Sequence, residues 1–340
     1  MRMNRMAALG ASMLVLLSAC STGGGTTSSP AAPGSPTNAA PSSDAGASPS
    51  TGASAPTGDT IASQLILGGP PECPERPFCL IGLEETYGLE FQEFRPLDAG
   101  GPLTVAALEG GDIDVGLLFT SDPSIADKGF VLLEDDMQLQ LADNLIPVVR
   151  QEVLEESPEI AELIDPWMAM LTQEELTALN KLVVVDQEDP ADVVEQWLSE
   201  NGLETGDAGA DTTVTVGSTN FYEQEILGEI FAQILEANGF EVERKFQLGA
   251  REVVFPALES GEIDILAEYI ATALLFVDPE GEASTDAAAT AEAFNTALEP
   301  RGLVALDFAP ATDQNGFVVT QATADQYGLA AMSDLADPAP

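Results

Sequence analysis

The sequence predicts an α/β fold in which two similar lobes face a ligand cleft, and an internal repeat is the main evidence. Residues 105–119 (VAALEGGDIDVGLLF) align without a gap with residues 255–269 (FPALESGEIDILAEY), at an offset of 150 residues. In each copy a helix ends at a glycine, Gly111 or Gly261, because a residue without Cβ can take the left-handed conformation of a helix cap. The apolar run after each glycine predicts a buried strand that ends on an aromatic residue. Two lobes that each present such an aromatic indicate a ligand cleft rather than a solenoid.

The repeat continues upstream of these segments. Residues 65–69 and 214–218 each form a short apolar run that stops at small residues, which is typical of a strand. After a helix-length segment, residues 87–91 and 238–242 each contain a glycine followed by alternating apolar and polar residues, which predicts a second strand. Each copy is therefore strand–helix–strand–helix–strand, the pattern of a parallel sheet with right-handed crossovers. Ligands of such sheets bind outside the carboxyl ends of the strands.

The first sixty residues indicate export. A basic start precedes the apolar stretch 6–17, which is too short to span a membrane as a mature helix. Residues 17–20 (LSAC) resemble the bacterial lipobox, which implies a lipoprotein signal peptide over residues 1–20, cleavage before Cys20 and a lipid on its sulfur. An ordinary secretory signal with a chance cysteine is the alternative. Residues 21–60 are rich in Ser, Thr, Gly, Pro and Ala, and this composition predicts a disordered tether.

The composition excludes several classes of function. The chain carries 57 Asp and Glu residues against 11 Lys and Arg residues, which argues against nucleic-acid binding because phosphates require a basic face. The acidity does not identify a cationic ligand, since acidic surfaces are usually solvated. The chain has no histidine, so the commonest general base is missing, and no pair of carboxylates stands out from the acidic background. We therefore expect a protein that is not an enzyme and that uses no cofactor.

Two cysteines, Cys73 and Cys79, remain once Cys20 is assigned to the lipid. In an exported chain an isolated close pair of cysteines is more often a disulfide than a metal site. A zinc site would lack soft ligands here, because the chain has no histidine and no further cysteine. We expect a disulfide between Cys73 and Cys79 and no metal site.

Several motifs occur together between residue 63 and the C-terminus. They are 67–72 (LGGPPE) with Arg76, 119–122 (FTSD), 133–136 (LEDD), 180–203, 216–224 (VGSTNFYEQ), 257–264 (ALESGEID) and 268–272 (EYIAT). In this combination they resemble the substrate-binding proteins of bacterial ABC importers for glycine betaine, choline, carnitine and related osmoprotectants. The resemblance covers residues 63–340.

This resemblance implies a type II periplasmic-binding-protein-like fold, in which two α/β lobes are joined by a hinge and close over an interlobe cleft. The two halves stand in the opposite order, however. In the family, the segment like residues 214–336 comes first and the segment like residues 65–203 follows it. The sequence therefore predicts a circularly permuted fold whose old ends are joined through residues 204–211, since exposed polar joints tolerate permutation. A fragment of a broken tandem protein is the alternative.

A permuted fold would have one split lobe and one continuous lobe. We expect the split lobe to comprise residues 61–144 and residues 313–340, and the continuous lobe to comprise residues 145–312. Residues 333–340 should then lie beside residues 61–64, because these segments would be consecutive in an unpermuted relative.

The family holds a quaternary ammonium group in a box of aromatic faces, because a methylated cation cannot donate hydrogen bonds and cation–π attraction remains. The resemblance places Tyr269, Phe119 and Phe317 at aromatic positions of this box. It places Arg76 where a ligand carboxylate can be held. Each has an ordinary alternative, which is core packing for the aromatic residues and a surface charge for Arg76. The other positions that the resemblance implies as ligand contacts are Asn315, Thr272, Asp143, Thr219, Asn220 and Thr120.

Two of these positions depart from the family pattern. Thr219 replaces the lysine that follows Gly-Ser in the family, so one cation for a ligand carboxylate is missing. Asp143 stands where the family has a cage tyrosine, and an acid there favours a cation over a ligand that carries a carboxylate. The ligand could thus be choline-like, polyamine-like, or larger and hydroxylated.

The leading hypothesis is the receptor of an ABC importer, anchored by lipid to the outer face of the cytoplasmic membrane. It would bind a small quaternary-ammonium or related polar or cationic osmoprotectant and deliver it to the membrane permease. A surface lipoprotein that senses a ligand and acts on a membrane partner is the alternative. A surface hydrolase is disfavoured, because no nucleophile–base pair is evident. We expect a monomer that contacts the membrane through its lipid alone.

Overall fold

The computed structural model describes residues 59–98, 100–209 and 212–340, and all of them belong to one compact unit, Ser54–Pro340. The predicted signal peptide, the lipid site at Cys20 and most of the predicted tether lie outside the described residues. Within those residues, none of the helices has the length and apolar composition needed to cross a bilayer.

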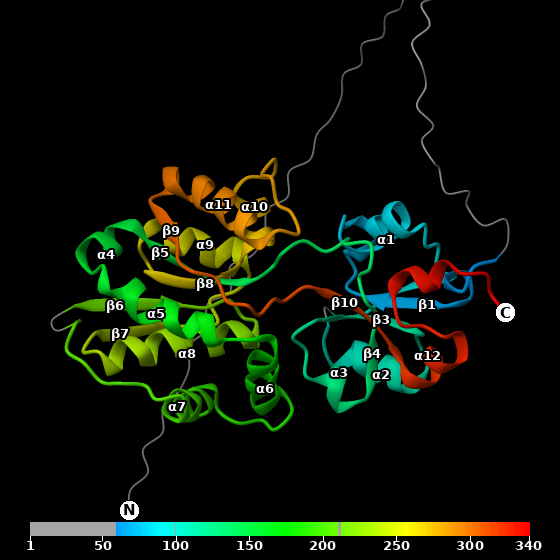
Figure 1. Ribbon diagram of the computed structural model, residues 1–340, viewed down its shortest axis with the longest axis horizontal. Helices are drawn as coiled ribbons and strands as arrows, with labels where there is room; N and C mark the ends of the chain where they lie inside the picture. Colours follow the sequence, from blue (N-terminus) through cyan, green and yellow to red (C-terminus); the bar gives the residue numbers. More distant parts are fainter. Residues whose placement is uncertain (1–58, 99, 210–211) are drawn as a thin grey trace, which may run out of the picture. The chain divides into compact units, whose positions relative to one another are not determined.

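Two sheets, each covered by helices, carry the fold (Figure 1). The first has the strand order β2-β1-β3-β10-β4 and the second has the order β7-β6-β8-β5-β9. In each, three strands run parallel, and the fourth, β10 or β5, pairs antiparallel with the third. The strands are β1 (Ile66–Gly69), β2 (Glu93–Pro96), β3 (Val115–Phe119), β4 (Phe130–Leu132), β5 (Leu145–Arg150), β6 (Thr213–Gly217), β7 (Glu241–Lys245), β8 (Ile265–Tyr269), β9 (Leu303–Ala305) and β10 (Asn315–Thr320). The predicted class, α/β with two lobes, is confirmed. Below, the split lobe is the one around the first sheet and the continuous lobe is the one around the second.

Helices cover both faces of each sheet. In the continuous lobe, α5 to α8 pack on one face and α9 to α11 on the other. In the split lobe, α1 and α12 share a core on one face, and α2 packs on the other. The α-helices are α1 (Leu80–Tyr87), α2 (Pro102–Gly110), α3 (Ser124–Asp127), α4 (Gln151–Glu156), α5 (Glu159–Met170), α6 (Gln173–Val184), α7 (Pro190–Glu200), α8 (Tyr222–Ala237), α9 (Arg251–Ser260), α10 (Ile270–Val277), α11 (Ala287–Leu298) and α12 (Gln321–Tyr327). Short 3₁₀ turns span Ala62–Gln64, Cys73–Glu75, Glu299–Arg301 and Met332–Ala336.

The internal repeat forms two equivalent units, β1-α1-β2-α2-β3 and β6-α8-β7-α9-β8. Helices α2 and α9 end at the predicted glycines, Gly111 with φ 70° and Gly261 with φ 78°, which is the left-handed region of a C-cap. Strands β3 and β8 follow, and each is buried until its last residue, Phe119 or Tyr269, which is half-buried. The predicted helix ends and aromatic strand ends are therefore confirmed.

The second strand of each copy begins later than predicted. Helix α1 ends at the predicted glycine, Gly88, whose φ is 68°, but β2 begins at Glu93, four residues after the predicted start at Leu89. Tyr87 belongs to the helix because its ring is buried in the split lobe and its hydroxyl donates a hydrogen bond to Asp135. Strand β7 begins at Glu241, one residue after its predicted start at Phe240.

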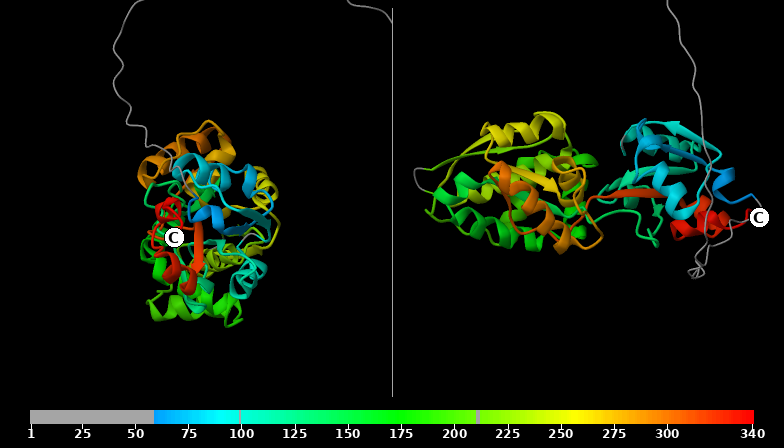
Figure 2. Two further views of the ribbon diagram at one scale, coloured as in Figure 1. Left: turned by 90° about the vertical axis from the view of Figure 1, so that its right-hand side faces the viewer. Right: turned by 90° about the horizontal axis from the view of Figure 1, so that it is seen from above.

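Two segments of the chain pass between the lobes, one from β4 to β5 and the other from β9 to β10 (Figure 2). They pair where they cross. An isolated antiparallel bridge joins Asn144 to Thr312, and the Asp313 N–H donates to the Asp143 carbonyl oxygen at 3.0 Å. The crossings therefore lie side by side, as a hinge between two lobes requires.

The first and last described segments also pair with each other. An antiparallel bridge joins Thr60 to Pro338, and the Ile61 N–H donates to the Asp337 carbonyl oxygen at 2.9 Å. The predicted proximity of the two ends of the fold is confirmed.

Candidate functional site

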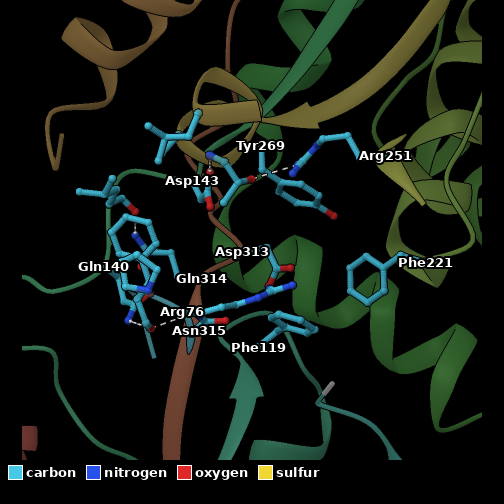
Figure 3. Close-up of a pocket in the computed structure, with 16 residues that line it drawn as sticks. Arg76, Phe119, Gln140, Asp143, Phe221, Arg251, Tyr269, Asp313, Gln314 and Asn315 are labelled. Carbon is cyan, nitrogen blue, oxygen red and sulfur yellow. Dashed lines mark hydrogen bonds between the residues drawn. The ribbon is translucent and has the colours of Figure 1, made fainter. Parts of the chain in front are cut away.

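A pocket of about 430 Å³ lies between the two lobes, beside the crossings (Figure 3). Its walls come from the split lobe, the continuous lobe and both crossing segments, so a bound molecule would touch every part of the hinge. The lining residues with polar or aromatic side chains are Arg76, Phe78, Phe119, Gln140, Asp143, Phe221, Arg251, Tyr269, Thr272, Asp313, Gln314 and Asn315.

Besides Phe78, three aromatic residues from different segments line this pocket (Figure 3). Phe119 ends β3 in the split lobe, Tyr269 ends β8 in the continuous lobe, and Phe221 is the N-cap residue of α8. The rings of Phe119 and Phe221 contact each other edge to face, with centroids 5.6 Å apart. This contact joins the two lobes at the pocket. Sequence reasoning missed Phe221, although it lies in the motif 216–224.

Asp143 supplies a carboxylate on the first crossing. Its Oδ1 accepts a hydrogen bond from the Thr272 N–H at 2.8 Å, and the residue is only 7% exposed. Burial raises the pKa of Asp143 to about 6, because desolvation outweighs the opposing effects of the Thr272 N–H and the Arg251 charge. The carboxylate is therefore mostly ionised at neutral pH and mostly protonated at pH 5.

Arg251, at the start of α9, is a half-buried cation that the sequence reasoning did not identify. Its Nε and Nη2 donate to the Glu268 carboxylate at 2.9 and 2.8 Å, and its Nη2 also donates to the Thr272 hydroxyl at 3.0 Å. The guanidinium is thus neutralised by a buried acid. Its partner lies seventeen residues further along the chain, so local sequence gave no sign of the pair.

A disulfide shapes the split-lobe wall of the pocket. Cys73 and Cys79 are bonded, with Cα atoms 5.2 Å apart, and the loop between them carries Arg76 and Phe78 into the pocket wall. The Arg76 side chain lines the pocket, is 61% exposed and pairs with Glu72 at 3.1 Å. The predicted bond is present, and it constrains the backbone around the pocket.

A buried polar cluster lies behind the aromatic wall. The Tyr269 hydroxyl donates to Glu223 Oε1 at 2.8 Å, and Asn180 Nδ2 donates to Glu223 Oε2 at 2.6 Å. Asn180 also donates to the Ser121 carbonyl oxygen at 3.2 Å, and the Ser121 hydroxyl donates to Asp313 Oδ1 at 2.7 Å. The cluster therefore connects both lobes and the second crossing.

The two acids of this cluster have raised pKa values. Burial raises the pKa of Glu223, and it raises the pKa of Asp313 well above its usual range, with the nearby Glu223 charge adding to the effect. Burial also keeps the pKa of Tyr269 well above 10, so its hydroxyl stays protonated and donates to Glu223.

The structure brings together Arg76, Phe119, Asp143, Tyr269, Thr272 and Asn315 among the residues that the sequence nominated. Phe317 lies elsewhere. It is 1% exposed and packs in the apolar core of the split lobe with Cys73 and Cys79. Phe317 follows Asn315 by two residues on the same face of β10, so it lies about 7 Å deeper in the lobe.

Three further nominated residues do not line the pocket, and each makes a local structural contact. The Thr219 hydroxyl accepts from the Phe221 N–H at 3.3 Å, which shapes the start of α8. The Asn220 N–H donates to the Gly249 carbonyl oxygen, and the Thr120 hydroxyl accepts from the N–H of a residue on the second crossing. These contacts position the pocket wall rather than a ligand.

The chain resembles known proteins over most of its length. A family model described as the substrate binding domain of ABC-type glycine betaine transport system matches residues 54–200 and 212–340. The chain is 37% identical over 142 residues to a glycine-betaine-binding protein of Pseudomonas aeruginosa, which covers 41% of this chain and 45% of that protein. It is 34% identical over 128 residues to the glycine betaine-binding protein YehZ of Escherichia coli, which covers 37% of this chain and 42% of YehZ. These alignments span less than half the length of either relative.

Among solved structures, apo YehZ from Escherichia coli aligns with a TM-score of 0.37 and 14% identity, over 80% of this chain and 85% of that one.

Proposed function

Because the chain belongs to the family of substrate-binding domains of ABC-type glycine betaine transport systems, we propose that it is the extracytoplasmic receptor of an ABC importer. It binds a small quaternary-ammonium or related cationic osmoprotectant and delivers it to the membrane permease. The lipid on Cys20 holds it at the outer face of the cytoplasmic membrane, and it acts as a monomer.

The observation that carries this proposal is the interlobe pocket, which is lined by aromatic rings from both lobes and by Asp143. Phe119, Phe221 and Tyr269 offer π faces to a cation, an interaction of about 2 kcal/mol when the site is desolvated. Asp143, ionised at neutral pH, adds an opposite charge. Arg251 is already paired with Glu268, so it opposes a cationic ligand little. The ligand contacts that we propose are Tyr269, Phe119, Phe221, Asp143, Thr272, Asn315 and Arg76.

The two-lobe architecture supports coupling of binding to closure. A ligand in the pocket contacts residues of both lobes, so it stabilises the closed arrangement over an open one in proportion to those extra contacts. The paired crossings at Asn144 and Thr312 provide the axis of such a movement. A permease that recognises the closed arrangement would then respond to the loaded receptor.

Thermal unfolding of the mature protein against a panel of osmolytes tests the proposal. A true ligand at one hundred times its dissociation constant should add about 2.7 kcal/mol to the free energy of unfolding. A neutral sugar of similar size is the control. The proposal fails if no cationic or zwitterionic osmolyte raises the melting temperature above that control.

Uptake distinguishes import from sensing. Cells that lack this chain should lose uptake of the labelled ligand, and the chain supplied in trans should restore it. Unchanged uptake in those cells, together with retained ligand binding, would instead identify a sensor.

A further inference from the structure

Asp313, on the second crossing, contributes a carboxyl group to the pocket wall (Figure 3). The residue is only 9% exposed, and its Oδ1 accepts hydrogen bonds from the Ser121 hydroxyl at 2.7 Å and from the Ser121 N–H at 3.4 Å. Among the described residues, no donor reaches its Oδ2. One carboxyl oxygen of Asp313 is therefore held in place, and the other is left for a bound molecule.

Glu223, on α8, is a second buried acid, and its charge acts on Asp313. Its carboxylate accepts from two neutral groups, the Tyr269 hydroxyl and the Asn180 amide. Within the part of the chain that the structure describes, every hydrogen-bond donor to the two acids is neutral. Two buried carboxylates without a cationic partner cannot both be ionised at low cost. The pair therefore keeps a proton in the protein without ligand.

The cationic side chains of the pocket wall have other partners. Arg251 forms a salt bridge with Glu268 at 2.8 Å, and the largely exposed Arg76 is also paired with an acid. The pKa of Asp313 is accordingly raised, mainly by burial and further by the charge of Glu223. The other titratable groups around the pair are Tyr222 on α8, Tyr269 on β8, Asp122 after β3 and Asp143 on the first crossing.

A cation in the pocket would change this balance. A quaternary ammonium has no N–H, so it is bound by charge and by contact with aromatic faces. The Tyr269 ring lies close to both acids, because its hydroxyl donates to Glu223 and the charge of Asp313 acts on it. A cation that contacts this ring is therefore also close to Asp313. In a desolvated site, an opposite charge at that position favours the ionised carboxylate.

We propose that Asp313 is the counter-ion of the bound cation, and that the Glu223–Asp313 pair releases a proton to the solvent when the cation binds. This inference rests on the proposed function as a receptor of cationic osmoprotectants and adds a selectivity residue to the same site. One positive charge enters the pocket as another leaves it, so the net charge of the site stays constant. A neutral molecule of the same shape cannot make this exchange and is bound more weakly.

The exchange makes the affinity depend on pH in a fixed direction. Burial opposes ionisation of the pair in the free protein and the cation favours it, so binding lowers the pKa of the pair. The affinity for a cation should rise with pH between the bound and the free pKa, and should level off above the free value. Because the pKa of Asp313 lies well above its usual range, we expect this rise at alkaline pH, beyond the range in which Asp143 titrates.

Calorimetric titration counts the protons that binding releases. The mature protein is titrated at pH 8.5 with choline and with its uncharged carbon analogue, 3,3-dimethylbutan-1-ol, in Tris and in EPPS, two buffers that differ in ionisation enthalpy. Asp143, with a pKa of about 6, is already ionised at this pH, so the released protons come from the pair. We expect choline to release up to one proton and the analogue none. Choline should also bind about tenfold more tightly, because one pKa unit of coupling equals a factor of ten in affinity.

Two substitutions separate the roles of the acids. Asp313→Asn removes the counter-ion but keeps an oxygen for the Ser121 hydroxyl, so it should weaken choline about tenfold and abolish the proton release. Glu223→Gln removes the acid that raises the pKa of Asp313, so it should reduce the proton release while choline keeps its affinity. Glu195→Gln, an exposed position on α7, is the matched control and should change neither quantity. Thermal unfolding establishes that each variant is folded.

The outcomes separate this inference from the proposed function. Choline that binds without proton release, or with the same affinity to the wild type and to Asp313→Asn, overturns the inference and leaves the receptor function standing. Equal affinity for choline and for its carbon analogue does the same. If neither choline nor glycine betaine binds, the inference fails, and the wider osmolyte panel then decides the receptor function. If a variant does not fold, the proton release of the wild type and the comparison with the analogue decide.

Discussion

Asp143 shows how one side chain can make recognition depend on pH. Its carboxylate lies at the wall of the pocket, and burial raises its pKa to about 6. Protonation removes the charge and leaves the Thr272 N–H bonded to a neutral acid. A cationic ligand therefore meets an ionised partner only above this pH.

The affinity for a cation should rise as the pH rises through 6. Below that value the ionised fraction of Asp143 falls about tenfold per pH unit, so the affinity should fall by up to that factor. Binding titrations at pH 5, 6 and 7.5 measure this dependence. Asp143→Asn should remove most of the dependence of affinity on pH and should weaken binding of the cation at pH 7.5. A zwitterionic ligand should be spared. The same slope in the wild type and in Asp143→Asn would assign the titration to another group.

Tyr269 contributes both a ring and a hydroxyl, and two substitutions separate them. Tyr269→Ala removes the aromatic face and should weaken the binding free energy of a cationic ligand by about one to two kcal/mol. Tyr269→Phe keeps the face but removes the donor to Glu223, so it should act on stability more than on affinity. Calorimetry and thermal unfolding measure the two effects. Equal affinity of the wild type and Tyr269→Ala would exclude a cation–π contact at this ring.

At the scale of elements, the loop closed by the disulfide positions groups of the pocket wall. The loop closed by Cys73 and Cys79 presents the Phe78 carbonyl oxygen, and this oxygen orients the amides of Gln140 and Asn315. One backbone group thus fixes two of the side chains that a ligand would meet.

Replacing both cysteines by serine should lower the free energy of unfolding by on the order of 2–3 kcal/mol. The loss is modest because the stabilisation by a disulfide grows with the length of the closed loop, and this loop is short. Ligand affinity should fall as well, since the Phe78 carbonyl loses its fixed position. Denaturant unfolding and titration of the double variant measure these effects. A reducing agent should reproduce them in the wild type and change nothing further in the variant. Unaltered affinity in the reduced protein would separate the loop from recognition.

The elements that the sequence predicted best are those with local signals. Strands β3 and β8 follow helix-ending glycines and have continuous apolar runs, so their positions were evident. Strand β2 was predicted too early, because the alternating residues after Gly88 resemble a strand, whereas β2 begins only at Glu93. The order of helices and strands in each repeat could be derived, but their exact bounds depended on tertiary packing.

The site was predictable where a side chain stands at the end of a repeat strand, as Phe119 and Tyr269 do. Arg251 and Asp313 could not be found in this way. Each is defined by distant partners, Arg251 by Glu268 and Asp313 by Ser121, 192 residues away in the sequence. Phe317 was nominated from the family resemblance, but its position on β10 places it in the apolar core of the split lobe instead of the pocket.

At the scale of the whole molecule, a circular permutation would explain both the order of the two halves and the pairing of the two ends of the fold. The family model matches two segments on either side of residues 201–211, and Thr60 bridges Pro338. We propose that the chain is a circular permutation of the family fold. A short connection could then replace the paired ends without disturbing either sheet.

A reconnected chain tests this proposal. Joining Pro340 to Asp59 through a short glycine linker, and opening the chain between residues 203 and 212, would restore the family order. We expect this variant to fold as a monomer with unchanged ligand affinity, as judged by thermal unfolding and titration. A matched variant opened inside α8 should not fold. Failure of the reconnected chain to fold would favour the broken-tandem alternative.

The pairing at the ends also has a mechanical consequence. Asp59 accepts a hydrogen bond from the Ala339 N–H, so the chain that precedes it joins the molecule at the split lobe. A membrane tether that joins the fold at Asp59 would therefore fix the split lobe, and the continuous lobe would be the part that moves. Tension on that tether would load the bridge between Thr60 and Pro338, not the crossings at Asn144 and Thr312. In that arrangement, opening and closing of the hinge would not be opposed by tension in the tether.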